Sequence, residues 1–511
     1  MSTTSESDPP TSESGPPADD TQHTGPPSAT ATAAVVADGP RAAGREVWPL
    51  VRRLHFYAGV FVAPFLALAA LTGLAYAFTP QLDALVYRDE LQVARVGGRS
   101  LALADQVRAA RAAHPEGAVA TVVPPADASS TTRVVLSVPD LGEKQRTVYV
   151  DPYTGKVRGE LTTWFGSTPL TTWLDEMHRS LHLGTAGRLY SETAASWLWV
   201  IVGGGLLMWL GRRRHYRGRG PARRALWPDG SAKGVRRTRG RHAVLGVWLG
   251  VVLLFLSATG LTWSDHAGAR FDSLQSHLRA TAPELDTARA GTTPAPGGGH
   301  GHHDGGAPTG TADPADDVDL VMAIARGEGL TGPIEISPPK DTGSLWSVAQ
   351  VDNRWPVRLD QIAVDASTVQ TGARVTWADH SWLAKLSTLG VQFHMGRLFG
   401  LPNQLLLAAT ALGLLGIIFW GYRMWWQRRP TREDRRALVG RPPARGTWRR
   451  LPRALLVLGV PAVLLVGWAV PLLGITLLAF LAADALTAVL RRRRTAGSPH
   501  IDPAPPERAT L

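Results

Sequence analysis

The hydrophobic positions along the chain gather into a few long, almost uncharged runs, separated by segments that are rich in arginine or of mixed polarity. An apolar run of roughly 20 residues spans the hydrocarbon layer as a helix, because lipid offers no partners to backbone polar groups. The runs are continuous and do not alternate, which argues against a β-barrel. The pattern therefore predicts a polytopic α-helical membrane protein whose clearest spans are 56–78, about 194–210, 243–263 and about 404–426.

A fifth apolar stretch, 454–490, is interrupted by Pro461 and Pro471 and has the length of a hairpin of two spans. It brings the predicted total to about six. The first 45 residues are rich in Ser, Thr, Pro, Gly, Ala and Asp, and they cannot bury enough surface to fold. They also lack the basic start and short apolar core of a signal peptide.

The basic residues gather at one end of every predicted span. Because arginine and lysine in short loops mark the cytoplasmic side, we expect both termini in the cytoplasm and two long segments, 80–193 and 264–403, to be exported. The net charge of +12 is then explained by the membrane, and we expect no nucleic-acid partner. The basic stretches are 52–53, 212–241, 427–453 and 491–494.

These features predict the following order of segments. It is a disordered cytoplasmic tail (1–45), a first span (46–79), an exported domain (80–193), a second span (194–211), a basic cytoplasmic loop (212–241), a third span (242–263), a second exported domain (264–403) with a Gly/His-rich loop (291–316), a fourth span (404–426), a second basic loop (427–453), a terminal membrane hairpin (454–490) and a cytoplasmic tail (491–511).

The chain also contains an internal repeat. His55 is followed at fixed distances by a glycine and a TGL triplet, and His242 is followed by the same residues at the same distances. The exported segments match as well: VDPYTG at 150–155 resembles VDAST at 364–368, and HLG at 182–184 resembles HMG at 394–396. Both copies have the same order and topology, which predicts a parallel repeat. Each exported segment is expected to contain a small antiparallel sheet with a helix packed on it.

Several motifs resemble the PepSY-associated transmembrane family, whose members include iron-regulated membrane proteins. The resemblance covers about 52–426 and is carried by RRLHFYAGVFVAPFLALAALTGLAYAF, VDPYTG, MHRSLHLGTAGRL, RHAVLGVWLG and FHMGRLFGLPNQ. It implies two exported α+β PepSY-like domains in a bacterial inner-membrane protein. Some members are similar to siderophore-linked ferric reductases, which implies b-type haem, two groups in our reading, and an electron path across the membrane. The chain has no cysteine, so c-type haem attachment is excluded.

Histidines at the membrane boundaries are the candidate ligands. His55 and His242 occupy equivalent positions at the cytoplasmic ends of the first and third spans, and imidazole ligates haem iron axially. The alternative is a pair of interfacial caps repeated by duplication. On the outer side, His178 and His182 are four residues apart and would share one helix face, opposite His394. His178 and His394 have the family-like contexts, while His182 aligns better with His394 within the repeat, so both remain candidates.

Other residues give weaker signals. His300, His302 and His303 lie in a Gly- and Pro-rich stretch, where any metal site would be loose. Asp151 and Asp365 follow strand-like runs, and a hairpin turn is their expected role.

Two functions from different classes fit the sequence. The first is an oxidoreductase that takes electrons from a quinol or a cytoplasmic reductase and reduces a ferric siderophore or another iron chelate outside. The second is a non-enzymatic module whose PepSY-like domains bind or regulate an exported partner such as a peptidase. Matched histidines at both membrane faces favour the first, because a binding module does not need them.

Overall fold

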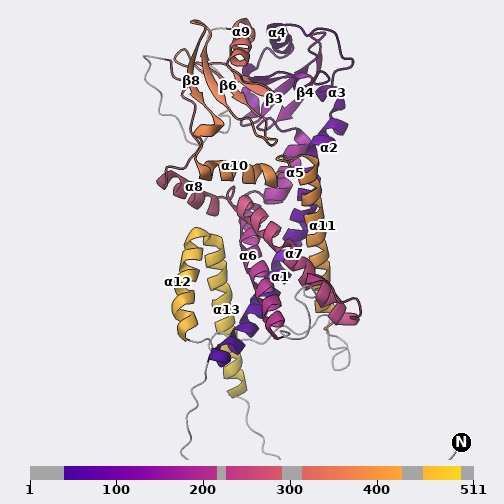
Figure 1. Ribbon diagram of the computed structural model, residues 1–511, viewed down its shortest axis with the longest axis vertical. Helices are drawn as coiled ribbons and strands as arrows, with labels where there is room; N and C mark the ends of the chain where they lie inside the picture. The colour runs from indigo at the N-terminus through magenta and orange to yellow at the C-terminus, as the bar shows by residue number, and fades with distance from the viewer. Residues whose placement is uncertain (1–39, 216–225, 290–312, 429–452, 497–511) are drawn as a thin grey trace, which may run out of the picture.

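The computed structural model describes residues 40–215, 226–289, 313–428 and 453–496. It places a bundle of long helices below a β-sheet unit, with short helices between the two (Figure 1). The Gly/His-rich residues 300–303 and most of the predicted tails and basic loops lie outside the described residues.

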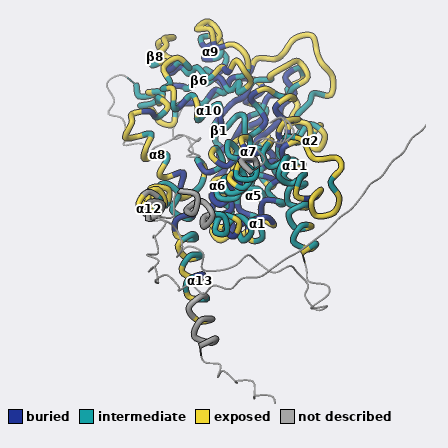
Figure 2. The backbone as a smooth tube through the Cα atoms, turned by 60° about the horizontal axis from the view of Figure 1, so that its bottom comes forward, coloured by how far each residue is buried: buried dark blue, intermediate teal, exposed yellow. Residues whose placement is uncertain are grey.

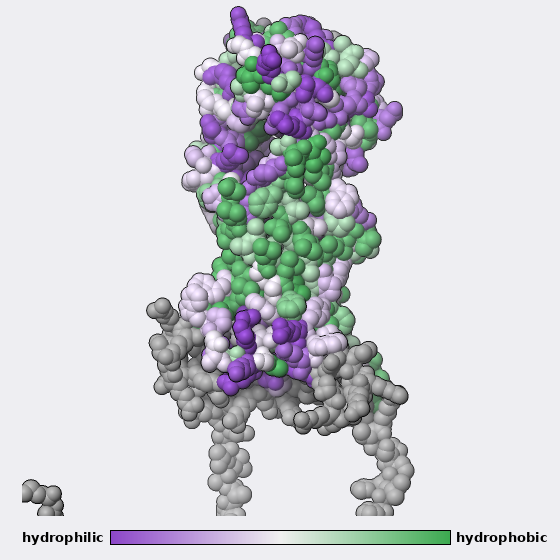
Figure 3. All heavy atoms as spheres, turned by 90° about the vertical axis from the view of Figure 1, so that its right-hand side faces the viewer, coloured by the Kyte–Doolittle hydropathy of each residue, from purple (hydrophilic) through white to green (hydrophobic). Residues whose placement is uncertain are grey.

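Four helices of the described chain are long and apolar enough to cross a membrane, and they form the bundle. They are α1 (Pro40–Ala77), α6 (Gly184–His215), α7 (Gly234–Leu261) and α11 (Leu401–Trp426). The predicted multi-pass helical architecture is therefore confirmed, although each helix begins before the predicted apolar run. On the face shown in Figure 3, an apolar band covers these helices between two hydrophilic ends. Their buried core includes Ala58, Val62, Phe65, Leu66, Ala194, Trp197, Leu198, Val202 and Leu253.

The predicted terminal hairpin consists of α12 (Arg453–Ala469) and α13 (Pro471–Ala496). Pro471 begins the second helix, a position where the missing backbone N–H costs nothing. The apolar parts of these helices, Gly459–Ala469 and Pro471–Thr487, are shorter than those of the bundle. Their crossing of the membrane stays a prediction.

The eight strands of the described residues form one antiparallel sheet in the order β4-β3-β2-β1-β5-β6-β7-β8. The first predicted domain supplies four strands and the second supplies the other four. This differs from the expectation of two separate sheets, because β1 and β5 pair at Val122 and Ile336. Pairing covers two strand edges that would otherwise expose backbone donors and acceptors. The strands are β1 (Ala118–Val123), β2 (Thr132–Ser137), β3 (Gln145–Val150), β4 (Val157–Thr163), β5 (Ile334–Ser337), β6 (Trp346–Gln350), β7 (Gln361–Asp365) and β8 (Gln370–Val375).

One helix from each half, α4 (Leu103–Ala113) and α9 (Pro314–Gly327), packs on the sheet. The Asp319 carboxylate of α9 accepts hydrogen bonds from the backbone N–H groups of Leu103 and Ala104, at 2.8 and 2.9 Å. These N–H groups belong to the first turn of α4, which has no partners of its own for them. The two halves thus share one core, and Figure 2 shows buried residues gathered in this unit.

The predicted hairpin turns at the two aspartates are confirmed. Asp151 follows β3, and its Oδ1 accepts hydrogen bonds from the backbone of Tyr153 and Thr154. Asp365 ends β7, and its Oδ1 accepts from the Ser367 backbone at 3.0 Å. Both carboxylates hold the chain in the turn to the next strand.

Short helices connect the sheet to the bundle (Figure 1). Two of them, α5 (Pro169–Ser180) and α10 (Trp382–His394), each begin with a hydroxyl side chain that accepts a hydrogen bond from the first turn. These two helices bring a histidine from each half to the end of the bundle. The others are α2 (Thr79–Val86), α3 (Arg88–Leu91) and α8 (Ala267–His277).

Candidate functional site

His55 on α1 and His242 on α7 meet inside the bundle, near its arginine-rich end. Their ring centroids are 6.1 Å apart and their planes are inclined by 86°. The Nδ1 atom of His55 lies 2.8 Å from the Ile201 carbonyl oxygen on α6. The Nδ1 atom of His242 lies 3.0 Å from the Ile417 carbonyl oxygen on α11. We call these two residues the inner pair.

Glycines surround the inner pair at positions where even a Cβ atom would be in van der Waals contact with it. A Cβ at Gly205 would lie 3.4 Å from His55 Cε1, and a Cβ at Gly204 would lie 3.4 Å from His55 Cβ. On the other side, a Cβ at Gly421 would lie 3.7 Å from His242 Cε1. Two glycines of the triplet 203–205 on α6 thus lie against His55.

The glycines one turn after each histidine of the inner pair face open space. A Cβ at Gly59 or at Gly246 would meet no atom within 4 Å. Residues four apart share a helix face, so this space adjoins His55 and His242.

His178 on α5 and His394 on α10 form an outer pair at the sheet end of the bundle. Their ring centroids are 6.4 Å apart and their planes are inclined by 80°. The Nδ1 atom of His178 lies 2.9 Å from Thr72 Oγ1, and that of His394 lies 2.7 Å from Thr259 Oγ1. Both threonines belong to the TGL triplets. A Cβ at the following glycine, Gly73, would lie 3.2 Å from His178 Cε1.

The hydrogen bonds assign the same tautomer to all four rings. The Thr72 hydroxyl donates to the Leu68 carbonyl at 2.9 Å, and the Thr259 hydroxyl donates to the Phe255 carbonyl at 2.9 Å. Each hydroxyl has one proton, so it accepts from the Nδ1–H of its histidine. In the inner pair the partners are carbonyls, which only accept. In every case Nδ1 carries the proton and the lone pair of Nε2 is left to bind a metal.

Burial favours the neutral form of both outer histidines. Desolvation by burial lowers the pKa of His178, and desolvation together with the nearby His178 lowers the pKa of His394 to about 4. Neutral imidazole is the form that binds a metal.

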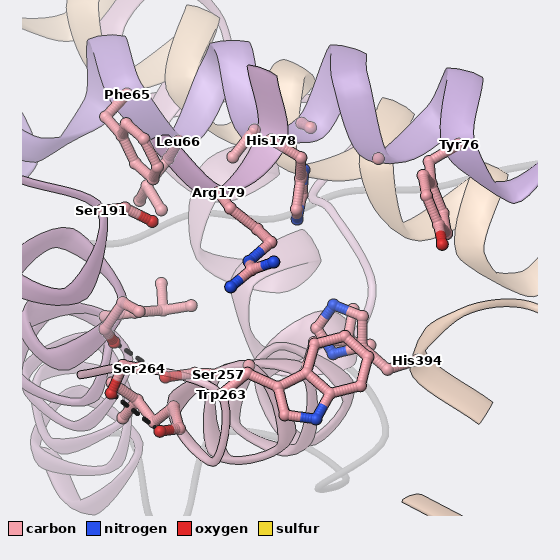
Figure 4. A pocket seen from close by; sticks show the side chains of 18 of the residues that line it. Phe65, Leu66, Tyr76, His178, Arg179, Ser191, Ser257, Trp263, Ser264 and His394 are labelled. Atoms are coloured by element: carbon pink, nitrogen blue, oxygen red, sulfur yellow. Dashed lines mark hydrogen bonds between the residues drawn. The ribbon is translucent and has the colours of Figure 1, made fainter. Parts of the chain in front are cut away.

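A cavity of about 230 Å³ adjoins the outer pair and extends down between the four bundle helices. Figure 4 shows His178, His394 and Arg179 pointing into it. Its lower wall is apolar and includes Phe65, Leu198 and Leu414. Its mouth is charged, with the ion pairs Arg179–Asp175 and Arg188–Asp265, each at 3.3 Å.

His182 does not join the outer pair, and the expectation that it shares a helix face with His178 is wrong. The helix α5 ends at Ser180, and Leu181 and His182 have left-handed backbone angles, with φ of 56° and 54°. The chain therefore turns before a fourth residue can stack above His178. The ring of His182 instead lies 5.3 Å from that of Trp173, and its Nε2 bonds the Trp173 carbonyl.

Sequence reasoning missed the roles of Thr72 and Thr259 as partners of the outer histidines. The repeated TGL triplet was the available signal, but it identified the repeat and not a hydrogen bond. No feature of the sequence could identify the Ile201 and Ile417 carbonyls as partners of the inner pair, because every residue has a backbone carbonyl. Arg179 and Arg188 were also missed, since charged residues near a membrane boundary are common.

Each histidine pair could hold one haem iron between its two imidazoles. Two imidazoles that shared one metal ion, with metal–nitrogen bonds of about 2.0 Å, would have their ring centroids roughly 6.3 Å apart. The observed separations are 6.1 and 6.4 Å. Among the described residues no group of three or more His, Cys, Asp or Glu residues could hold a metal ion.

A family model described as the PepSY-associated TM region matches residues 52–428. The match includes both histidine pairs and the whole sheet unit, and it ends before the terminal hairpin. No curated protein matches the chain.

Proposed function

The chain belongs to the family defined by the PepSY-associated TM region, and from this premise we propose that it is a haem-containing oxidoreductase. It passes electrons across the membrane and reduces ferric chelates, such as ferric siderophores, on the side of the sheet unit. The observation that carries the proposal is the geometry of the two histidine pairs. Each pair has the ring separation that iron requires and a free Nε2 on both rings.

The matching surroundings of the two halves support the internal repeat. His55 donates a hydrogen bond to a carbonyl of α6, and His242 donates one to a carbonyl of α11. In the outer pair, His178 is hydrogen-bonded to the Thr72 hydroxyl, and His394 is hydrogen-bonded to the Thr259 hydroxyl. Each pair takes one histidine from each half, so a duplicated chain folds back on itself and completes both sites. Interfacial caps have no need to face each other across a bundle.

The spacing of the two pairs suits electron transfer across a membrane. Thr72, the partner of His178, lies about 25 Å from His55 along α1, at 1.5 Å per residue. Bound haem would supply reversible one-electron chemistry at each level. The protein holds each imidazole in one orientation through its Nδ1–H bond, which also makes the ligand more basic. The apolar wall of Phe65, Leu198 and Leu414 keeps water out of the space between the levels.

The remaining parts of the proposal rest on the arginine distribution and on the family. We propose a bacterial inner-membrane location, both termini in the cytoplasm, and the sheet unit outside, with the terminal hairpin as two further spans. Electrons then enter at the inner pair, from a quinol or a cytoplasmic reductase, and leave at the outer pair. The charged cavity mouth at Arg179 and Arg188 is where a ferric chelate would approach.

The test is reduction of a ferric chelate by purified protein in liposomes. With reductant sealed inside, wild-type protein should convert external ferric chelate to the ferrous form, and His394→Ala should abolish this conversion. A His182→Ala variant is the matched control and should retain it. If wild-type protein supports no reduction and binds no haem, the partner-binding function takes its place, and an exported partner should then be recovered on the sheet unit.

A further inference from the structure

A groove of about 400 Å³ lies on the outer surface of the bundle at the arginine-rich end of α11. Positions 419, 422, 423 and 426 are three and four residues apart, so they form one stripe along the helix. Phe419 and Trp426 are 60% and 53% exposed on a helix that is apolar enough to span a membrane. The groove therefore opens toward lipid. It is lined by Phe419, Tyr422, Arg423, Trp425 and Trp426.

The floor of this groove is connected to the inner pair. Gly421, whose Cβ would lie 3.7 Å from His242 Cε1, directly precedes Tyr422. The Trp425 ring lies 5.8 Å from the ring of Phe56, the residue after His55. The Tyr422 hydroxyl donates a hydrogen bond to the Val60 carbonyl on α1 at 3.0 Å, which fixes its ring between the two helices.

Aromatic residues are common where a helix leaves the membrane, and by themselves they indicate only the interface. Here the aromatic rings line a groove together with the guanidinium of Arg423. They also lie next to neighbours of both inner histidines. A flat ring stacks on such side chains in offset or edge-on arrangements. The Arg423 guanidinium is a donor that could bond an oxygen on such a ring. An apolar tail attached to the ring would continue into lipid.

We propose that this groove binds the ring of an isoprenoid quinol, the electron donor to the inner pair. The inference rests on the proposed function for the direction of electron flow, but not for binding. Oxidation of one quinol to its quinone releases two electrons and two protons. The electrons reduce two ferric ions to ferrous ions, one at a time, and the protons pass to water at the arginine-rich side.

The experiment is photolabelling of the purified full-length protein with a short-chain azido-benzoquinone, followed by peptide mapping. Labelling should concentrate on 419–426, saturate, and be competed by excess unlabelled short-chain quinone. Phe419→Ala and Arg423→Gln should each lower the saturable labelling several-fold. Trp248→Leu removes an exposed aromatic ring of α7, 56% exposed, and serves as the matched control that leaves it unchanged.

Even labelling of all exposed spans, without competition, overturns the inference and shows simple partition into the lipid or detergent phase. The labelling result is independent of the proposed function, because labelling of the groove needs no haem. Haem-loaded protein with uncompeted labelling refutes the quinol site alone. Competed labelling in protein that binds no haem supports the site and refutes the oxidoreductase.

Discussion

His178 and His394 face each other with 6.4 Å between their ring centroids, although they lie on different short helices in different halves of the chain. Each ring is held by a threonine from a different bundle helix. Four elements are therefore needed to build this pair, and each histidine depends on a partner far away in sequence. His182, four residues from His178, has no part in it.

Replacing the two neighbouring histidines separately should distinguish ligation from a structural role. His178→Ala should remove one haem of two, because it removes the imidazole that faces His394. His182→Ala should leave the haem content unchanged, because that ring contacts Trp173, a backbone carbonyl and the Glu176 carboxylate, and it does not face His394. Haem extracted from each purified variant, measured per chain, checks this. Equal haem loss in both variants would contradict the assignment of His178.

The threonine partners should control haem affinity without binding haem themselves. Thr72→Val removes the acceptor for the Nδ1–H of His178 while keeping the side-chain volume. Loss of such a supporting hydrogen bond typically costs 10–100-fold in metal affinity. Thr72→Ser restores the hydroxyl and should restore affinity. Haem transfer to an apo-globin in excess measures the loss rate, and equal rates in the two variants would rule out this role.

The sequence was sufficient to predict the four long apolar helices, the turns at Asp151 and Asp365, and the histidines that meet in the two pairs, because hydrophobicity, turn chemistry and repeated contexts are local signals. The predictions failed where a feature depends on residues that are far apart in the chain. The β1–β5 pairing that merges the two sheets depends on tertiary packing. The exclusion of His182 depends on where α5 ends, and helix ends are poorly specified by periodicity. The partners of the rings are backbone carbonyls and a hydroxyl from distant elements, which no spacing rule identifies.

Two glycines of the triplet 203–205 on α6 can be replaced in turn to test whether haem occupies the space beside the inner pair. Gly205→Leu should exclude the inner haem, since its Cβ alone would lie 3.4 Å from His55 Cε1. Gly203→Leu should be tolerated, since its Cβ would meet nothing within 4 Å. Absorption spectra of the purified variants should show half of the wild-type haem for the first change and the full amount for the second. Full occupancy in Gly205→Leu would mean that haem does not lie against α6.

A buried ion pair attaches the terminal hairpin to the bundle. The side chains of Arg53 on α1 and Asp484 on α13 are each 4% exposed and form a salt bridge. Removing one partner of a buried pair leaves an uncompensated charge and typically costs about 3–5 kcal/mol, whereas replacing both partners by apolar residues can be nearly neutral. Asp484→Leu should therefore lower the thermal unfolding midpoint in detergent.

The double variant Arg53→Met/Asp484→Leu should recover most of that loss. If it unfolds as early as Asp484→Leu alone, the destabilisation does not come from the unpaired arginine, and the ion pair is not what holds the hairpin.

The reduced-minus-oxidised absorption spectrum of the purified protein, combined with haem quantification, tests the central claim most directly. The account predicts b-type haem at two per chain in the wild type, one per chain in His242→Ala and one per chain in His394→Ala. The two single variants should each keep the spectral component that the other loses. A wild-type protein without haem, or variants that both retain two haems, would contradict the account.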